Sequence, residues 1–142
     1  MKLFPQIVFI FFSLSLCGQE IFGVWKSSDR SSGNDQALIK IYSEDNKIYA
    51  KIIEAIDPDL KNYICLKCKG ENKDKPMEGM IILKELIPSS DKTKFHKGFA
   101  LNPFNGKYYK CDATFINKDL IRVRGFIGIS LFGKSEYWQR VK

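Results

Sequence analysis

Histidine is almost absent from this sequence: among 142 residues there is one, His96. It lies in a lysine-rich polar stretch with no nucleophile or orienting acid at a recognisable spacing, so no Ser-His-Asp set can be drawn. Carboxylates are numerous, but those in the longest polar segment lack the spacing of a glycosidase or of a calcium loop. We therefore expect no catalytic residues, no cofactor and no bound metal, and we predict that the protein is not an enzyme.

Long hydrophobic runs are also missing, except at the N-terminus. There, Lys2 precedes the apolar run 7–16, which is too short for a membrane span because a spanning helix needs about 20 apolar residues. A basic residue, a short apolar run and then small or polar residues are typical of a secretory signal peptide. We expect cleavage near Gly18, which makes residues 1–18 the leader and residues 19–142 one secreted or periplasmic domain without a transmembrane segment.

Two alternatives to simple cleavage concern the same leader. One is an uncleaved signal anchor, which the short apolar run does not favour. Leu14-Ser15-Leu16-Cys17 also resembles a loose lipoprotein box, in which Cys17 would carry a lipid. Because Leu16 is bulky where that motif favours a small residue, cleavage without lipidation is the preferred interpretation.

The composition describes a folded and basic domain. Apolar residues make up 44% of the chain, which excludes disorder and provides a core for one globular domain. Lys and Arg number 23 against 16 Asp and Glu. A nucleic-acid-binding protein would gather its basic residues on one helix or stripe, whereas the lysines here are spread through every segment. We expect a solvated surface with no nucleic-acid partner and weak attraction to an anionic envelope surface.

Short β-like runs separated by turn residues recur along the rest of the chain, without repeats, heptads or an amphipathic helix. These runs are 21–25, 36–42, 47–56, 79–86, 97–101, 107–116, 120–127 and 134–141. The polar segment 57–76 predicts one long Cys-containing loop, and Asn105-Gly106 is typical of a tight hairpin. Because closure removes exposed sheet edges, we predict an all-β fold: a closed antiparallel barrel of about eight short strands.

The first and last strands carry a possible closure motif. Gly23-Val24-Trp25 and Trp138-Gln139-Arg140 resemble the framework of lipocalin-like barrels, in which an early Gly-x-Trp packs beneath a late Arg and closes one end. An indole can fill the narrow end, while the guanidinium stacks on it and caps nearby carbonyls. The resemblance implies that barrel closure involves Gly23, Trp25, Trp138 and Arg140.

A wider set of motifs follows in one order along the chain. They are Gly23-x-Trp25, Cys65-Leu66-Lys67-Cys68, Lys75-Pro76-x-x-Gly79, Asn102-Pro103-x-x-Gly106-Lys107-x-Tyr109, and Arg124-Gly125-Phe126-Ile127-Gly128-x-x-Leu131-Phe132-Gly133 before Trp138-x-Arg140. Together they resemble domain-of-unknown-function family 2147 of secreted bacterial proteins. The resemblance covers nearly the whole mature chain. It implies a lipocalin-like β-barrel in the cell envelope and no established activity.

One motif matches a pattern that is typical of nucleotide-binding proteins. The residues from Gly128 to Ser135 match the P-loop pattern G-x4-G-K-[ST] letter for letter. A P-loop needs a helix after the lysine to aim backbone amides at phosphate, yet the few residues that follow Ser135 have the pattern of a strand. We interpret the motif as a turn between the last two strands, whose glycines permit a tight backbone.

Cys65 and Cys68 admit three interpretations. Zinc would need two more ligands, and only Cys111 and His96 remain in the expected mature chain. Thiol redox catalysis would need a setting that lowers the thiol pKa, for which only neighbouring lysines are visible. A structural disulfide that pins the long loop in an oxidising compartment is preferred. Cys111 alternates with apolar residues on its strand, which predicts a buried free cysteine.

Arg122 and Arg124 lie two residues apart on one expected strand, so both point away from the face of Ile121 and Val123. If the arginine face lines the barrel, Arg124 could bind a carboxylate or phosphate through two parallel hydrogen bonds. The preferred alternative is that both arginines face solvent or pair structurally with an acid such as Glu136.

Two functional hypotheses follow. The first is a non-enzymatic barrel that binds a small apolar or amphipathic ligand, with Trp25, Tyr109, Phe115 and Arg124 as candidate ligand-binding residues. The second is a cell-envelope structural or interaction module whose side-chain-filled barrel meets a partner protein. An eight-stranded barrel can either be filled by side chains or hold one small ligand. A cavity of a few hundred cubic ångströms would favour the first hypothesis.

Overall fold

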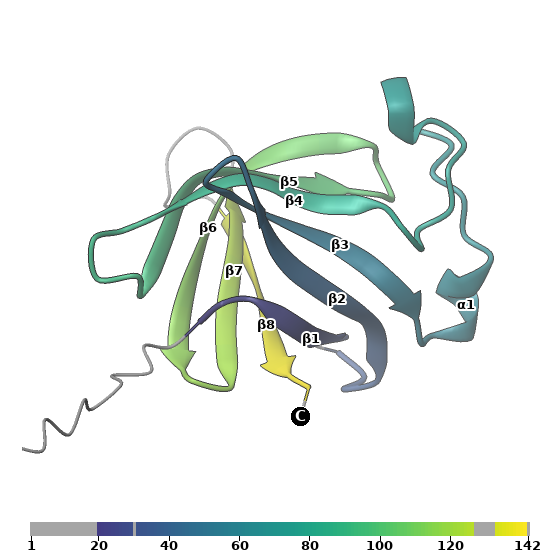
Figure 1. The fold of residues 1–142 in the computed structure, drawn as a ribbon. Coiled ribbons are helices and arrows are strands. Elements are labelled where there is room, and N and C mark those ends of the chain that lie inside the picture. The colour runs from purple at the N-terminus through teal and green to yellow at the C-terminus, as the bar shows by residue number, and fades with distance from the viewer. Residues whose placement is uncertain (1–19, 30, 127–132, 142) are drawn as a thin grey trace, which may run out of the picture.

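The strands of the chain form a closed antiparallel barrel in the order β1-β2-β3-β4-β5-β6-β7-β8 (Figure 1). The computed structural model describes residues 20–29, 31–126 and 133–141. The strands are β1 Gly23–Ser28, β2 Asp35–Glu44, β3 Lys47–Ala55, β4 Ile81–Pro88, β5 Lys94–Asn102, β6 Lys107–Asn117, β7 Leu120–Phe126 and β8 Gly133–Arg140. Each pairs with the next along the chain, and β1 pairs with β8. The predicted all-β closed barrel is confirmed, and each expected run overlaps one strand.

Two predictions concern residues that the structure does not describe. The predicted signal peptide, Cys17 with it, and residues 128–132 of the P-loop-like motif lie outside the described residues. The rest of that motif, from Gly133 to Ser135, belongs to β8. Within the described part of the chain, no helix combines the length and apolarity that crossing a bilayer requires.

Alternating residues set the inner face of most strands, because successive side chains of a strand point to opposite sides. In β2 the buried side chains are Ala37, Ile39 and Ile41, and in β3 Ile48 and Ile52 are buried in the same way. Burying one such large aliphatic side chain contributes about 1.5–3 kcal/mol to folding. The barrel interior therefore accounts for most of the apolar core.

Two strands depart from simple alternation. Glu85 in β4 and Lys97 in β5 have φ angles of 63° and 60°, and the register shifts beside them. Such a bulge places an extra residue in the strand and reverses which residues face inward. As a result, Leu83 and Leu86 are both buried although they are three positions apart. A Cβ at Gly98 would overlap the side chain of Leu86, so the glycine makes room for this inward leucine.

One end of the barrel is closed around Trp25, which is fully buried and lies opposite Arg140 in the β1–β8 register. The indole Nε1 donates a hydrogen bond to the Ile21 carbonyl at 2.8 Å. Gly23 adopts a φ of +121°, a conformation that side chains disfavour. Its peptide neighbour Phe22 contributes a carbonyl that accepts a hydrogen bond from Arg140 at 3.2 Å. These contacts bring the two ends of the described chain together.

The connection between β3 and β4 is the predicted long loop, but it contains one helical turn, α1 (Pro58–Lys61), and one 3-10 turn (Gly70–Asn72). No helix was predicted there. The turn forms because the Asp57 side chain accepts a hydrogen bond from the Asp59 amide and Pro58 presets the first helical φ. The predicted disulfide between Cys65 and Cys68 is confirmed in this loop.

Candidate ligand-binding cavity

Aromatic rings pack together at the closed end of the barrel. The ring of Phe115 lies 6.2 Å from that of Trp25 and 6.0 Å from that of Phe95, measured between centroids. Centroid separations of this size are typical of favourable tilted and edge-on aromatic pairs. The three rings therefore pack together in the interior near the end that Arg140 closes.

The opposite half of the barrel contains a cavity of about 790 Å³. It lies among the C-terminal ends of β5 and β7, the N-terminal ends of β6 and β8, part of β4 and the turn between β5 and β6. Its apolar wall includes Leu83, Ala100, Val123, Phe126 and Trp138. The volume lies within the range of about 300–1,000 Å³ that is common for small-molecule sites.

Strand β8 supplies polar groups to the cavity wall. Glu136 and Lys134 share the inward side of β8 with Trp138, because they are separated from it by two and four residues. The indole Nε1 of Trp138 donates a hydrogen bond to Glu136 Oε2 at 3.2 Å. In the register with β7, Glu136 lies opposite Val123 and Lys134 lies opposite Gly125. An acidic and a basic side chain therefore lie beside the apolar residues of the wall.

A second polar pair lies at the opening. Asn105 Nδ2 donates a hydrogen bond to the hydroxyl of Tyr109 at 2.8 Å, and Asn105 Oδ1 accepts one from the Lys107 amide at 2.9 Å. Both side chains line the cavity. A phenol can also donate its own proton, so Tyr109 can present a donor to a bound molecule.

The turn between β5 and β6 forms part of the cavity rim and is supported by the disulfide loop. Tyr63 Oη donates a hydrogen bond to the Pro103 carbonyl at 3.1 Å, and Cys65 Sγ lies 3.0 Å from the same oxygen. The Tyr63 and Phe104 rings are 5.1 Å apart between centroids. Gly106 has a φ of +73°, and a Cβ there would overlap the Lys67 carbonyl group. The loop and the turn are therefore in close contact.

The candidate ligand-binding residues are divided between different places. Tyr109 lines the cavity, whereas Trp25 and Phe115 pack together at the closed end. Arg124 lies on the outer face, since it alternates with the buried Val123 and pairs across the sheet with Asp112 and Ser135. The arginine face therefore does not line the barrel.

The inward orientation of alternate residues of β8 explains why Glu136 does not pair with the arginines and why it lines the cavity together with Lys134. Glu136, named above as a structural partner for the arginines, lies on the inner side of β8, away from their face. Lys134, Glu136 and Asn105 were not predicted as cavity residues. For Lys134 and Glu136 a signal was present, because both have the same strand parity as Trp138.

A smaller hollow of about 380 Å³ lies over β5 and β6, where His96 Nδ1 is 3.6 Å from Asp112 Oδ1. Cys111 is one of its lining residues and is a free, buried cysteine, as predicted. Burial, with a further contribution from Asp112, raises the pKa of the Cys111 thiol to about 12. The thiol is therefore protonated and unreactive at neutral pH. Within the described ranges, no cluster of three or more His, Cys, Asp and Glu side chains is placed to hold a metal ion.

The fold resembles that of one solved protein whose printed description is "Protein HP1028 from the human pathogen Helicobacter pylori belongs to the lipocalin family". The TM-score is 0.73 at 18% sequence identity, and the match covers 87% of this chain and 84% of that chain. At this identity the likeness establishes the fold, a lipocalin-like barrel. Among curated proteins, no significant match was found.

One family matches almost the whole barrel. Its description is "Uncharacterized protein conserved in bacteria (DUF2147)", and the match runs over residues 23–140, from the first residue of β1 to the last residue of β8. The resemblance inferred from the ordered motifs is thereby confirmed. The chain belongs to the DUF2147 family.

Proposed function

We propose that the protein is a non-enzymatic binding protein that holds one small apolar or amphipathic molecule in the cavity between β5 and β8. The observation that carries this proposal is the cavity of about 790 Å³ in a barrel whose closed end is packed with aromatic rings. A lipocalin-like barrel is typically a binding fold. The competing hypothesis, a barrel filled by side chains, expects no such space.

The wall chemistry favours an amphipathic ligand over a fully polar one. Leu83, Val123 and Trp138 offer an apolar surface, and each Å² of apolar ligand surface buried there is worth about 25 cal/mol. Lys134 and the Asn105–Tyr109 pair provide a cation and hydrogen-bonding groups near the opening. We propose that the ligand places its apolar part against Trp138 and its polar end near Lys134.

Glu136 limits the charge that the ligand can carry. Its Oε2 accepts a hydrogen bond from Trp138, so the carboxylate is held on the inner wall. An anionic group would be repelled near Glu136 and attracted near Lys134, which lies two residues closer to the start of β8. This arrangement supports one orientation, with the acidic or polar group near Lys134.

The proposed location is outside the cytoplasm. A leader over residues 1–18 with the typical order of a signal peptide supports export, and we propose that residues 19–142 form the secreted or periplasmic domain. The Cys65–Cys68 disulfide supports an oxidising compartment. A partner protein in the envelope is compatible with this location, but no contact described above requires one.

The test is binding of a polarity-sensitive naphthylamine probe by the purified protein. Val123→Phe and Ala100→Phe would each fill the cavity from a different strand, and we expect each to weaken probe binding about tenfold or more. Ile116→Phe is the matched control, because Ile116 is 48% exposed on the outer face of β6. Circular dichroism and thermal melting check that the variants fold. Native mass spectrometry of protein isolated from its own envelope then identifies the natural ligand.

Two results would contradict the proposal. One is a wild-type protein that binds neither the probe nor a co-purifying small molecule. The other is equal probe affinity in the wild type and in both folded cavity-filling variants.

A further inference from the structure

The open end of the barrel carries exposed apolar side chains on two neighbouring loops. Leu66 is 73% exposed, Phe104 51% and Ile64 46%, and Leu66 is the most exposed large apolar residue in the described part of the chain. Single exposed apolar residues are ordinary on protein surfaces. Here, however, the three belong to one structural unit, which we call the rim: residues 61–75 and 103–107.

The rim is held together by direct contacts between its two segments. Gly106 packs so closely against the Lys67 carbonyl that no Cβ would fit, and Cys65 Sγ lies 3.0 Å from the Pro103 carbonyl oxygen. Tyr63 adds a hydrogen bond to that same oxygen. Leu66 itself lies between two disulfide-bonded cysteines. The exposed apolar residues therefore project from a fixed base.

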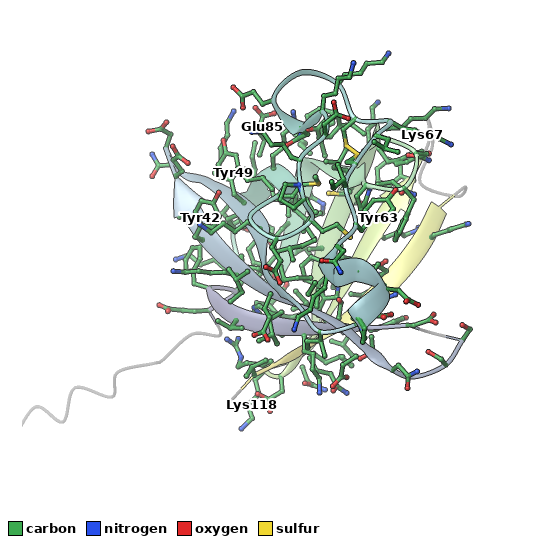
Figure 2. The ribbon with its side chains drawn as sticks, turned by 90° about the vertical axis from the view of Figure 1, so that its right-hand side faces the viewer. Tyr42, Tyr49, Tyr63, Lys67, Glu85 and Lys118 are labelled. Atoms are coloured by element: carbon green, nitrogen blue, oxygen red, sulfur yellow. A yellow bond between two sulfur atoms is a disulfide. The ribbon has the colours of Figure 1, made fainter. Side chains whose placement is uncertain are left out.

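The rim is also basic. Residues 61–75 include five exposed lysines against the two carboxylates Glu71 and Asp74, and residues 103–107 add a further exposed lysine. The exposed lysines of the rim are Lys61, Lys67, Lys69, Lys73, Lys75 and Lys107. Figure 2 shows Lys67 near this end of the barrel and Lys118 near the other. Apolar tips surrounded by lysines are the composition of surfaces that lie on anionic membranes.

We propose that the rim docks on an anionic lipid bilayer, with Leu66 and Phe104 entering the boundary between headgroups and acyl chains and the surrounding lysines contacting lipid phosphates. A protein partner fits less well, because the centres of protein interfaces are depleted in lysine. Phe104 is both a rim residue and part of the cavity wall. Docking therefore turns the cavity opening toward the bilayer, which is a source of amphipathic molecules.

The experiment measures binding to vesicles of equal parts phosphatidylglycerol and phosphatidylcholine, and to vesicles of phosphatidylcholine alone. The chain used begins at Gln19 and so lacks the apolar leader, while it retains all eight strands of the closed sheet. We expect binding to the anionic vesicles only, and weaker binding as salt is raised, because ions screen the lysines.

Matched variants separate the rim from the rest of the surface. Leu66→Ser should weaken vesicle binding about tenfold, since it removes a buried apolar side chain from the docked state. The pair Lys67→Glu and Lys69→Glu should weaken it by about twentyfold or more, at about fivefold for each lysine lost. The controls are Ile116→Ser and Lys118→Glu at the closed end, which should leave binding unchanged.

A spectroscopic readout reports insertion directly. In Leu66→Trp, the new indole should shift to shorter emission wavelengths and be quenched by brominated lipid when anionic vesicles are added. Absence of vesicle binding, equal binding to both lipid compositions, or equal losses in rim and control variants would each overturn the inference. Because the variants lie outside the cavity, probe binding should persist in them, so this result and the test of the proposed function are independent.

Discussion

The guanidinium carbon of Arg140 lies 4.3 Å from the ring centroid of Trp25, directly across the junction where β8 meets β1. The same guanidinium donates hydrogen bonds to the carbonyls of Glu20, Phe22 and Lys118 at 2.6, 3.2 and 3.0 Å. One side chain therefore ties the N-terminal segment, the β6–β7 turn and the last strand together over a buried indole.

Arg140→Ala should lower the free energy of unfolding by about 2–4 kcal/mol, because it removes a stacked cation and leaves three carbonyls without this donor. Arg140→Lys should recover part of that loss, since an ammonium keeps the charge without the planar fork of donors. Urea unfolding followed by Trp fluorescence measures both. A loss below about 0.5 kcal/mol in the alanine variant would show that closure does not depend on this contact.

Gly106→Ala should destabilise the protein more than Gly33→Ala does. Both glycines have a φ of +73°, so both variants carry the same backbone strain of about 1 kcal/mol. Only at Gly106 would the added Cβ meet another segment, the Lys67 carbonyl, whereas nothing lies within 4 Å at Gly33. The difference between the two free energies of unfolding measures the steric contact alone. Equal free energies of unfolding in the two variants would mean that the disulfide loop moves aside at no measurable cost.

Replacing Cys65 and Cys68 together by serine should cost about 2 kcal/mol of stability at most, because the disulfide closes a loop with a sequence separation of only 3. Its larger effect should be local. We expect amide hydrogen exchange to become faster at residues 103–106, which rest on this loop, and to stay unchanged in β1 and β2. Dithiothreitol should reproduce the change in the wild type and should also alter the rate at which the cavity exchanges probe. Unchanged amide hydrogen exchange at residues 103–106 would contradict the expectation that the disulfide loop stabilises this turn.

Acid should unfold the β4–β5 turn locally. Asp91 accepts hydrogen bonds from the Ser89 hydroxyl, the Thr93 amide and the Thr93 hydroxyl, and these bonds lower its pKa from 3.8 to about 2. Because the pKa is lower in the folded state, the carboxylate stabilises the turn above about pH 4 and loses this effect as the pH falls toward 2. An NMR titration of the Asp91 carboxyl should give a midpoint near 2. Asp91→Asn should remove that pH dependence from the neighbouring amides, and a midpoint near 4 would contradict the expected bonding.

Local sequence patterns were sufficient for the strands, the closed topology and the cysteines. Alternation and turn residues depend on near neighbours in the chain, and the Cys65–Cys68 pair is separated by only 3 positions. Alternation along the strand was not sufficient to predict which residues of β4 and β5 face the barrel interior. The bulges at Glu85 and Lys97 reverse the inward face partway along each strand, and they depend on packing from other strands.

Predicting which residues line the cavity also requires knowing the contacts between residues that are distant in the sequence. Tyr109 lines the cavity, but the depth to which side chains fill the interior depends on how Trp25, Phe95 and Phe115 pack together. The contact between Gly106 and Lys67 likewise joins residues that are distant in sequence. The rim therefore could not be seen before the structure placed the two loops together.

The division of the barrel into an end packed with rings and an end with a cavity has an evolutionary consequence. Because the packed rings around Phe115 and the cavity wall at Ala100 involve different residues, we expect a change at Ala100 to affect the proposed ligand binding more than it affects folding. If the barrel holds a ligand as proposed, members of the family can differ in what they carry through a handful of wall substitutions, and a designer can change the site by the same route.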